Sequence, residues 1–202
     1  MKNVEQIKKW LENGSINIFG KPLAGKDSQC KILAELLSGN VLGAGEIFRG
    51  SDMPDSVKEC MKNGNLVPTQ DFIDIVLPFL NQERLMNKPL ILSSVGRWHG
   101  EEEGVIGAVK SAGHPIKIAI YLDLSDEELL NRLHATEQQA GRADRQEDSK
   151  EALKYRLNEF DAKTKPVLEY YKNLELLLTV NGTGTKEQVT NNIIFAINNF
   201  IK

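Results

Sequence analysis

One stretch of the chain, residues 16–37, limits the possible fold more than any other. It begins with residues 16–19, which are mostly apolar and favour a short buried strand. A loop bounded by Gly20 and Gly25 follows, then Lys26, and then apolar residues at helical spacing. This order predicts a phosphate-binding loop, because unpaired backbone N–H groups of the loop and of the first helical turn point at one place.

The loop departs from the usual G-x-x-x-x-G-K-[ST] pattern at one position. Asp27 stands where Ser or Thr is expected, and Ser28 comes one residue later. We expect Lys26 to contact the β- and γ-phosphates of a nucleotide and the Ser28 hydroxyl to ligate Mg²⁺. The other nucleotide-binding candidates in this stretch are Gly20, Ala24, Gly25, Asp27 and Gln29.

The overall composition excludes several classes of protein. With 202 residues, the chain is long enough for one domain with a proper core, and a net charge of −3 gives no case for a nucleic-acid or membrane partner. Cys30 and Cys60 form no C-x-x-C pair, so we expect reduced thiols. No apolar run approaches the ~20 residues of a membrane span. Residues 1–13 are too polar for a signal peptide, so we expect a cytoplasmic protein.

Strand and helix patterns alternate along most of the chain. This alternation predicts an α/β fold in three layers, with a parallel sheet between helices. An amphipathic helix over residues 1–14 precedes the first strand, and a single helix is expected over residues 153–171. Ser125 and Glu128 have the spacing of a capping box at a helix start. The expected strands are residues 16–19, a short strand from residue 40, and residues 89–92, 116–124 and 176–180.

Six motifs over roughly residues 16–201 resemble those of adenylate kinase-like nucleoside monophosphate kinases. Residues 20–29 are similar to the family's G-x-P-G-x-G-K-G-T-Q, with Leu23 and Asp27 in place of two glycines. The resemblance implies a P-loop NTPase fold with a five-stranded parallel sheet, a monophosphate-binding lid over residues 46–80 and a short second lid over residues 136–149. It also implies phosphoryl transfer from ATP to a nucleoside monophosphate such as AMP, with Mg²⁺, by a monomer.

The resemblance also assigns residues to the two substrates and to the transferred group. Arg132 and Gly184 lie where the family contacts the adenine of ATP. Two registers compete in the second lid, and both place arginines at the phosphates. The residues implied in transfer are Lys26, Arg97, Arg142, Arg145 and Arg156. Those implied in binding the acceptor are Gly45, Arg49, Leu66, Val67, Arg97 and Glu101.

Two departures from the family pattern leave alternatives open. Ser93 replaces an Asp that organises hydrated Mg²⁺ in the family. Either another carboxylate, Asp27 or Asp123, helps Ser28 and the phosphates to hold the metal, or catalysis is weak.

Glu101 replaces a Gln that reads the acceptor adenine, and a carboxylate suits the N–H groups of guanine better. An acceptor such as GMP, CMP or UMP, a different small acceptor, or a nucleotide-binding protein without catalysis therefore remain alternatives. Beside Glu101, Trp98 could stack on a base but is expected to pack under a lid. We expect His99 to be structural or on the surface.

Overall fold

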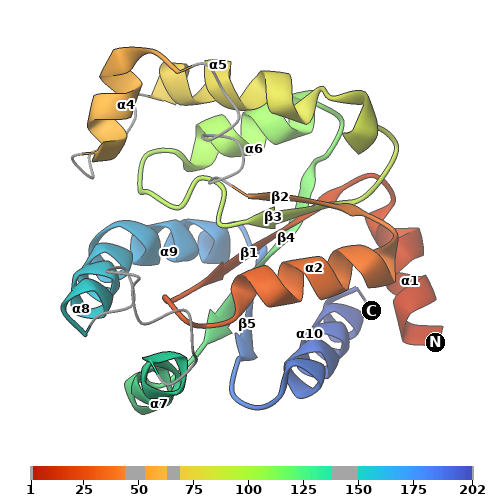
Figure 1. Cartoon of the computed structure of the whole chain (residues 1–202). Helices are drawn as coiled ribbons and strands as arrows, with labels where there is room; N and C mark the ends of the chain where they lie inside the picture. Colours follow the sequence, from red (N-terminus) through yellow and green to blue (C-terminus); the bar gives the residue numbers. More distant parts are fainter. Residues whose placement is uncertain (1, 44–52, 63–68, 138–149, 202) are drawn as a thin grey trace.

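A parallel β-sheet forms the centre of the protein (Figure 1). The structure, a computed structural model, describes residues 2–43, 53–62, 69–137 and 150–201. Within these residues the sheet has five strands in the order β2-β3-β1-β4-β5, and every strand pair is parallel. The predicted α/β fold is therefore confirmed. The strands are β1 Ser15–Gly20, β2 Asn40–Gly43, β3 Leu90–Ser93, β4 Ile116–Asp123 and β5 Leu177–Asn181.

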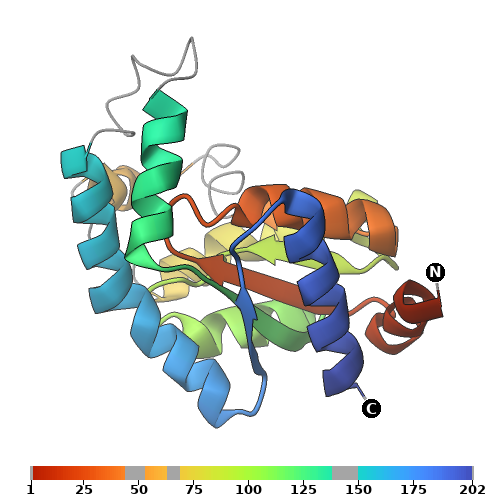
Figure 2. The ribbon, with the colours of Figure 1, turned by 90° about the horizontal axis from the view of Figure 1, so that it is seen from below.

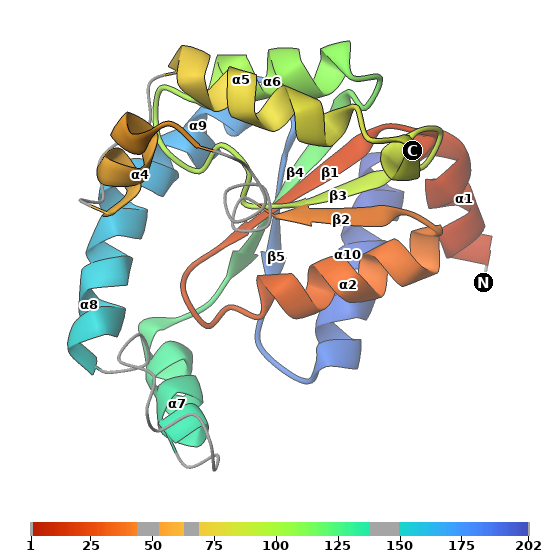
Figure 3. The same cartoon turned by 45° about the horizontal axis from the view of Figure 1, so that its top comes forward.

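Helices cover both faces of the sheet, as Figure 3 shows. One face packs against α1 (Lys2–Leu11), α2 (Lys26–Leu37) and α10 (Lys186–Phe200). The other face packs against α5 (Thr69–Leu80), α6 (Glu102–Ser111) and α9 (Lys165–Asn173). The remaining α-helices are α4 Asp55–Lys62, α7 Asp126–Glu137 and α8 Lys150–Glu159, and a short 3-10 helix spans Glu83–Leu85. No helix among the described residues is long and apolar enough to cross a membrane.

The central strand β1 is buried on both faces because its side chains alternate between two cores. Ile16 and Ile18 pack in the core formed with α1, α2 and α10, whereas Phe19 packs in the core on the opposite face. Buried Asn17 donates from Nδ2 to the Val95 carbonyl oxygen at 2.8 Å and accepts from the Val95 N–H at 3.3 Å. Asn17 of β1 thus fixes the loop that follows β3.

The single helix expected over residues 153–171 is wrong in one respect. A π-helical turn, Phe160–Thr164, separates α8 from α9. Pro166 follows in the first turn of α9 and has no N–H to donate to residue 162, so an unbroken α-helical ladder cannot run through this point.

The capping box expected at the start of α7 is only half formed. Ser125 Oγ accepts from the Glu128 N–H at 3.2 Å, but the Glu128 carboxylate accepts from Arg132 Nε at 2.9 Å instead. The complete box is at the start of α10, between Thr185 and Gln188.

Helix α1 lies where the sequence predicts an N-terminal helix and covers the edge of one core. Ile7 and Leu11 are fully buried there, and the Trp10 ring meets the Phe200 ring of α10 edge-on at 6.1 Å. Of the expected lids, residues 46–52, 63–68 and 138–149 lie outside the described residues, so the division into lids stays a prediction.

Candidate functional site

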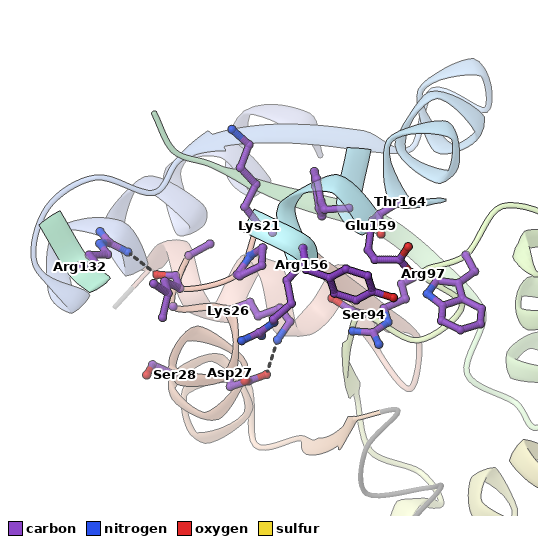
Figure 4. A pocket seen from close by; sticks show the side chains of 18 of the residues that line it. Lys21, Lys26, Asp27, Ser28, Ser94, Arg97, Arg132, Arg156, Glu159 and Thr164 are labelled. Atoms are coloured by element: carbon purple, nitrogen blue, oxygen red, sulfur yellow. Dashed lines mark hydrogen bonds and ion pairs between the residues drawn. The ribbon is translucent and has the colours of Figure 1, made fainter. Parts of the chain in front are cut away.

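A cavity of about 740 Å³ opens at the carboxyl ends of the central strands (Figure 4). Its walls come from the loop after β1, the start of α2, the loop after β3, and from α7, α8 and the π turn. A cavity at this edge is where open α/β sheets bind ligands. Its lining residues are Gly20, Lys21, Pro22, Leu23, Ala24, Gly25, Lys26, Asp27, Ser28, Ser94, Arg97, Trp98, Arg132, Ala135, Tyr155, Arg156, Glu159, Phe160 and Thr164.

The loop after β1 is shaped by two glycines. A Cβ on Gly20 would lie 2.9 Å from the Cβ of Ala24, so only glycine lets the loop fold back on itself. Gly25 caps α2 with a φ of 82°, in the left-handed region. Leu23 also has a positive φ, 65°, although it carries a side chain. The loop thereby brings Lys26, Asp27 and Ser28 to the cavity wall.

Positive charge dominates the cavity. Five of its lining residues are cationic, Lys21, Lys26, Arg97, Arg132 and Arg156, against the two carboxylates of Asp27 and Glu159. Arg97 and Arg156 both line the cavity, and desolvation, followed by the charge of Arg156, lowers the pKa of Arg97. Like charges gathered from the loops after β1 and β3 and from α2, α7 and α8 indicate a site for a polyanion.

Arg132 ties the loop after β1 to the loop after β5. Its Nη1 donates to the Leu23 carbonyl oxygen at 3.2 Å and its Nη2 to the Gly182 carbonyl oxygen at 2.9 Å. With Nε bonded to Glu128, the guanidinium plane is fixed, and such a plane can stack on an aromatic base.

Asp27 is held from two sides. Ser93, at the end of β3, donates from Oγ to Asp27 Oδ1 at 2.6 Å, and Lys26 Nζ lies 3.0 Å from the same oxygen. Desolvation raises the pKa of Asp27, but the Lys26 charge and the Ser93 hydrogen bond outweigh it, so the pKa lies below its ordinary value.

Cys30 lies beneath this cluster and is fully buried. Burial raises the pKa of its thiol to about 12, so it stays protonated and is no nucleophile. Cys30 is a free cysteine in the described part of the chain, and the expectation of reduced thiols stays a prediction.

Three residues expected to bind nucleotide do not line this cavity. Gln29 is 2% exposed and turns toward α10, donating from Nε2 to the Lys186 carbonyl oxygen at 2.9 Å and accepting from Thr190 Oγ1 at 2.8 Å. Gly184 lies at the capping box of α10, where a Cβ would come within 2.7 Å of Gln188 Oε1. Glu101 is buried at the start of α6.

Glu101 has an unusual environment for a carboxyl group. It is 5% exposed, and its Oε2 accepts from the Trp98 N–H at 3.3 Å. Burial raises the pKa of Glu101 to about 7, although the Trp98 hydrogen bond and the Arg97 charge act in the opposite direction.

The residues beside Glu101 support its loop. Lys163 Nζ lies 4.3 Å from the centroid of the Trp98 ring, and the exposed His99 bonds from Nδ1 to Glu102 Oε1 at 2.8 Å. These contacts agree with the expectation that His99 is structural or on the surface.

Some expected site residues lie outside the described part of the chain, and some lining residues were not expected. Lys21, Ser94, Tyr155, Glu159 and Thr164 line the cavity, although the motifs did not single them out for it. Tyr155 and Glu159 share a helix with Arg156, so helical spacing around that arginine was a usable signal. The site residues outside the described part are Gly45, Arg49, Leu66, Val67, Arg142 and Arg145.

Comparison with known proteins identifies the family. The adenylate kinase family model matches residues 18–176. The adenylate kinase of Prochlorococcus marinus (strain MIT 9515) is 34% identical over 180 residues, which cover 87% of this chain and 93% of that protein. The adenylate kinase of Leptospira biflexa is 31% identical over 184 residues, 89% of this chain and 97% of that protein. That of Phocaeicola vulgatus is 28% identical over 188 residues, 91% and 97% of the two chains. The protein therefore belongs to the adenylate kinase family.

Proposed function

We propose that this protein transfers the γ-phosphoryl group of ATP to AMP, giving two molecules of ADP. The observation that carries the proposal is the cavity into which the loop after β1, the loop after β3 and helix α8 bring Lys26, Arg97 and Arg156. Phosphoryl transfer needs positioning and charge stabilisation more than covalent chemistry, and fixed cations around a polyphosphate supply both.

The donor nucleotide binds along the loop after β1. Backbone N–H groups at the start of α2 and the Lys26 ammonium hold the β- and γ-phosphates. Gly20, Ala24 and Gly25 allow the close approach of the backbone, and the Arg132 guanidinium lies against the adenine. Gly184 belongs to the loop beside that adenine. Gln29 supports the site indirectly, because its side chain joins α2 to α10 by hydrogen bonds.

The acceptor and the transferred group are bound by arginines. Arg97 binds the acceptor phosphate and Arg156 the transferred phosphoryl group, because a planar guanidinium binds phosphate oxygens through two N–H donors. Arg142 and Arg145 join Arg156, and Gly45, Arg49, Leu66, Val67 and Glu101 complete the acceptor site. Closure of lids over residues 46–80 and 136–149 excludes water, so that ATP is not hydrolysed.

The cavity suits Mg²⁺, which prefers hard oxygen ligands and binds through phosphates and few protein groups. Ser28 offers a hydroxyl and Asp27 a carboxylate at the cavity wall. Ser28 is the proposed protein ligand. When bound, the metal ion neutralises negative charge on the phosphate oxygens. We further propose that the protein works as a monomer in the cytoplasm.

A coupled assay of ADP formation tests the proposal. We expect turnover with ATP, Mg²⁺ and AMP and none without acceptor. We expect Arg156→Ala to lower kcat by about 10²–10³-fold, since removing one charge-stabilising donor has effects of this size. The Arg156 side chain is exposed, so the free energy of unfolding should stay within about 0.5 kcal/mol. No turnover with any acceptor, while ATP still binds, would contradict the proposal.

A second acceptor is favoured by the residue type at position 101, a glutamate where the family has a glutamine. It suits the N1–H and N2–H₂ donors of guanine, whereas adenine N1 is an acceptor. GMP, CMP, UMP and dTMP therefore belong in the same assay, together with Glu101→Gln. If GMP were the better acceptor, Glu101→Gln should shift the ratio of kcat/KM toward AMP.

A further inference from the structure

We infer that Asp27, held in place by Ser93, is the carboxylate through which this enzyme engages the metal of its metal–ATP substrate. The inference rests on the proposed binding of the donor phosphates at the loop after β1. It assigns to Asp27 a part in metal binding and to Ser93, at the end of another element, the positioning of that carboxylate.

The geometry of the pair supports this assignment. Asp27 is in the first turn of α2 and Ser93 is the last residue of β3, yet Ser93 Oγ donates to Asp27 Oδ1 at 2.6 Å. The Asp27 side chain remains 72% exposed, so one oxygen is anchored while the group still faces the cavity. An anchored, accessible carboxylate next to the Ser28 hydroxyl provides the kind of oxygen donors that Mg²⁺ and its bound waters prefer.

The charge of Asp27 also needs an explanation where a polyphosphate binds. A carboxylate in this first helical turn repels phosphate oxygens unless a cation lies between them. In the structure Lys26 Nζ neutralises Asp27 at 3.0 Å, but the same ammonium is required by the phosphates. When Lys26 turns to the nucleotide, a divalent cation is the natural replacement partner for Asp27.

The other carboxylates near the cavity have different partners. Glu159 bonds to Lys163 at 2.6 Å, and Asp126 bonds to Lys21 at 2.7 Å. Asp123, at the end of β4, interacts with Tyr121 and does not line the cavity. Among the described residues, Asp27 is therefore the lining carboxylate in contact with the phosphate-binding lysine.

Ser93 fits its role because it donates a hydrogen bond and carries no charge. A second carboxylate at this distance from Asp27 would repel it, whereas a hydroxyl fixes it. The Asp27–Ser93 pair therefore carries one negative charge where the start of α2 meets the end of β3. A carboxylate at residue 93 instead of residue 27 would place the same charge at this junction.

The experiment measures how much the metal strengthens nucleotide binding. The affinity of the β,γ-imido analogue of ATP is measured by calorimetry with excess Mg²⁺ and with EDTA, and the ratio of the two dissociation constants is the metal effect. No turnover occurs with this analogue, so the readout is independent of catalysis. Electron paramagnetic resonance of bound Mn²⁺ provides a second readout.

We expect Asp27→Asn to lower the metal effect by about 10–100-fold, the range found when a group that orients metal ligands is removed. Affinity in EDTA should be unchanged or higher, because repulsion of the phosphates is removed. Ser93→Ala should lower the metal effect by about tenfold or less, since the carboxylate remains but is no longer anchored. The double variant Asp27→Gly with Ser93→Asp, which moves the charge across the pair, should recover most of the effect that Asp27→Gly loses.

Asp123→Asn is the matched control, because it removes a strand-end carboxylate that does not line the cavity. Its metal effect should equal that of the wild type. An unchanged metal effect in both Asp27→Asn and Asp27→Gly would overturn the inference and leave Ser28 and the phosphates as the metal ligands. Failure of the wild type to bind the analogue in either condition would instead contradict the proposed function.

Discussion

The ionisation of Glu101 makes the stability of the whole protein depend on pH. Its carboxyl group is buried, and its pKa is raised to about 7 from 4.5. A carboxyl group with a raised pKa in the folded state stabilises the protein most below its unfolded pKa, and this contribution is lost as pH rises through the folded pKa. The free energy of unfolding therefore carries a penalty from Glu101 that grows between about pH 4.5 and pH 7.

Glu101→Gln should remove this penalty. We expect the free energy of unfolding to rise by about 1–3 kcal/mol at pH 8 and to change little at pH 4.5, measured by urea denaturation at both values. Glu103→Gln is the control, because Glu103 is exposed in the same turn. Equal effects of Glu101→Gln at the two pH values would show that its ionisation does not oppose folding.

Replacement of glycine by alanine should lower the stability of the protein at Gly25 and raise it at Gly107. A Cβ on Gly25 has open space, its nearest neighbour being Arg132 Nη1 at 3.8 Å, but the φ of 82° is unfavourable for alanine. Gly25→Ala should therefore cost about 1–2 kcal/mol of stability. Gly107, inside α6, would meet nothing within 4 Å, so Gly107→Ala should gain up to about 1 kcal/mol. Thermal unfolding of both variants tests this, and stabilisation by Gly25→Ala would contradict it.

The sequence indicated about half of the cavity lining but not how its residues meet. Lys26, Ser28, Arg97, Arg132 and Arg156 are among the lining residues, and the roles that their motifs imply stay predictions. Spacing alone could not reveal the hydrogen bond between Ser93 and Asp27, because that bond depends on β3 lying beside β1 and on the start of α2. Nor could it show that Gln29 faces α10, since helical periodicity does not distinguish a buried polar contact from a ligand contact.

At the scale of elements, the two helix starts with capping sequences differ in a measurable way. At α10, Thr185 Oγ1 accepts from the Gln188 N–H at 3.2 Å and Gln188 Oε1 accepts from the Thr185 N–H at 2.8 Å. At α7, the Glu128 side chain does not form the reciprocal hydrogen bond of the capping box, and its carboxylate accepts from Arg132 Nε instead.

Thr185→Ala should lower the free energy of unfolding by about 1 kcal/mol, because it leaves an N–H at the helix start without its side-chain acceptor. Thr183→Ala, in the same loop, should change it by less than about 0.5 kcal/mol. Chemical denaturation monitored by circular dichroism measures both. Equal losses from the two variants would mean that the cap at α10 contributes nothing specific.

Elements with strong periodicity were predicted well, and breaks in them were not. The five strands and the helices α1 and α2 lie within a few residues of where the sequence pattern placed them. The π turn escaped prediction because Phe160, Thr164 and Val167 are all buried, and their spacing continues a regular helical stripe. The π turn is set by Pro166 and by tertiary packing around Thr164, and a local pattern does not record the packing.

At the scale of the molecule, α1 lies at the end of the sheet opposite to α7 and α8 (Figure 2), and these two helices help to line the cavity. Ile7 is fully buried between α1 and the core, so Ile7→Ala should cost about 2–5 kcal/mol of unfolding free energy. Because α1 contacts α2 and α10 rather than the cavity, kcat and KM of the folded fraction should be unchanged. Gln6→Ala, on the exposed side of α1, is the control. A changed KM for ATP in Ile7→Ala would show that α1 influences the site.

The order of the strands also determines when the protein can fold during synthesis. β1 leaves the ribosome well before its partners β3 and β4, and α1 and α2 are contacted by α10, which is made after all of these strands. A nascent chain must therefore carry exposed apolar faces until α10 has been made. A product that ends before α10 cannot bury them and becomes a substrate for chaperones and proteases.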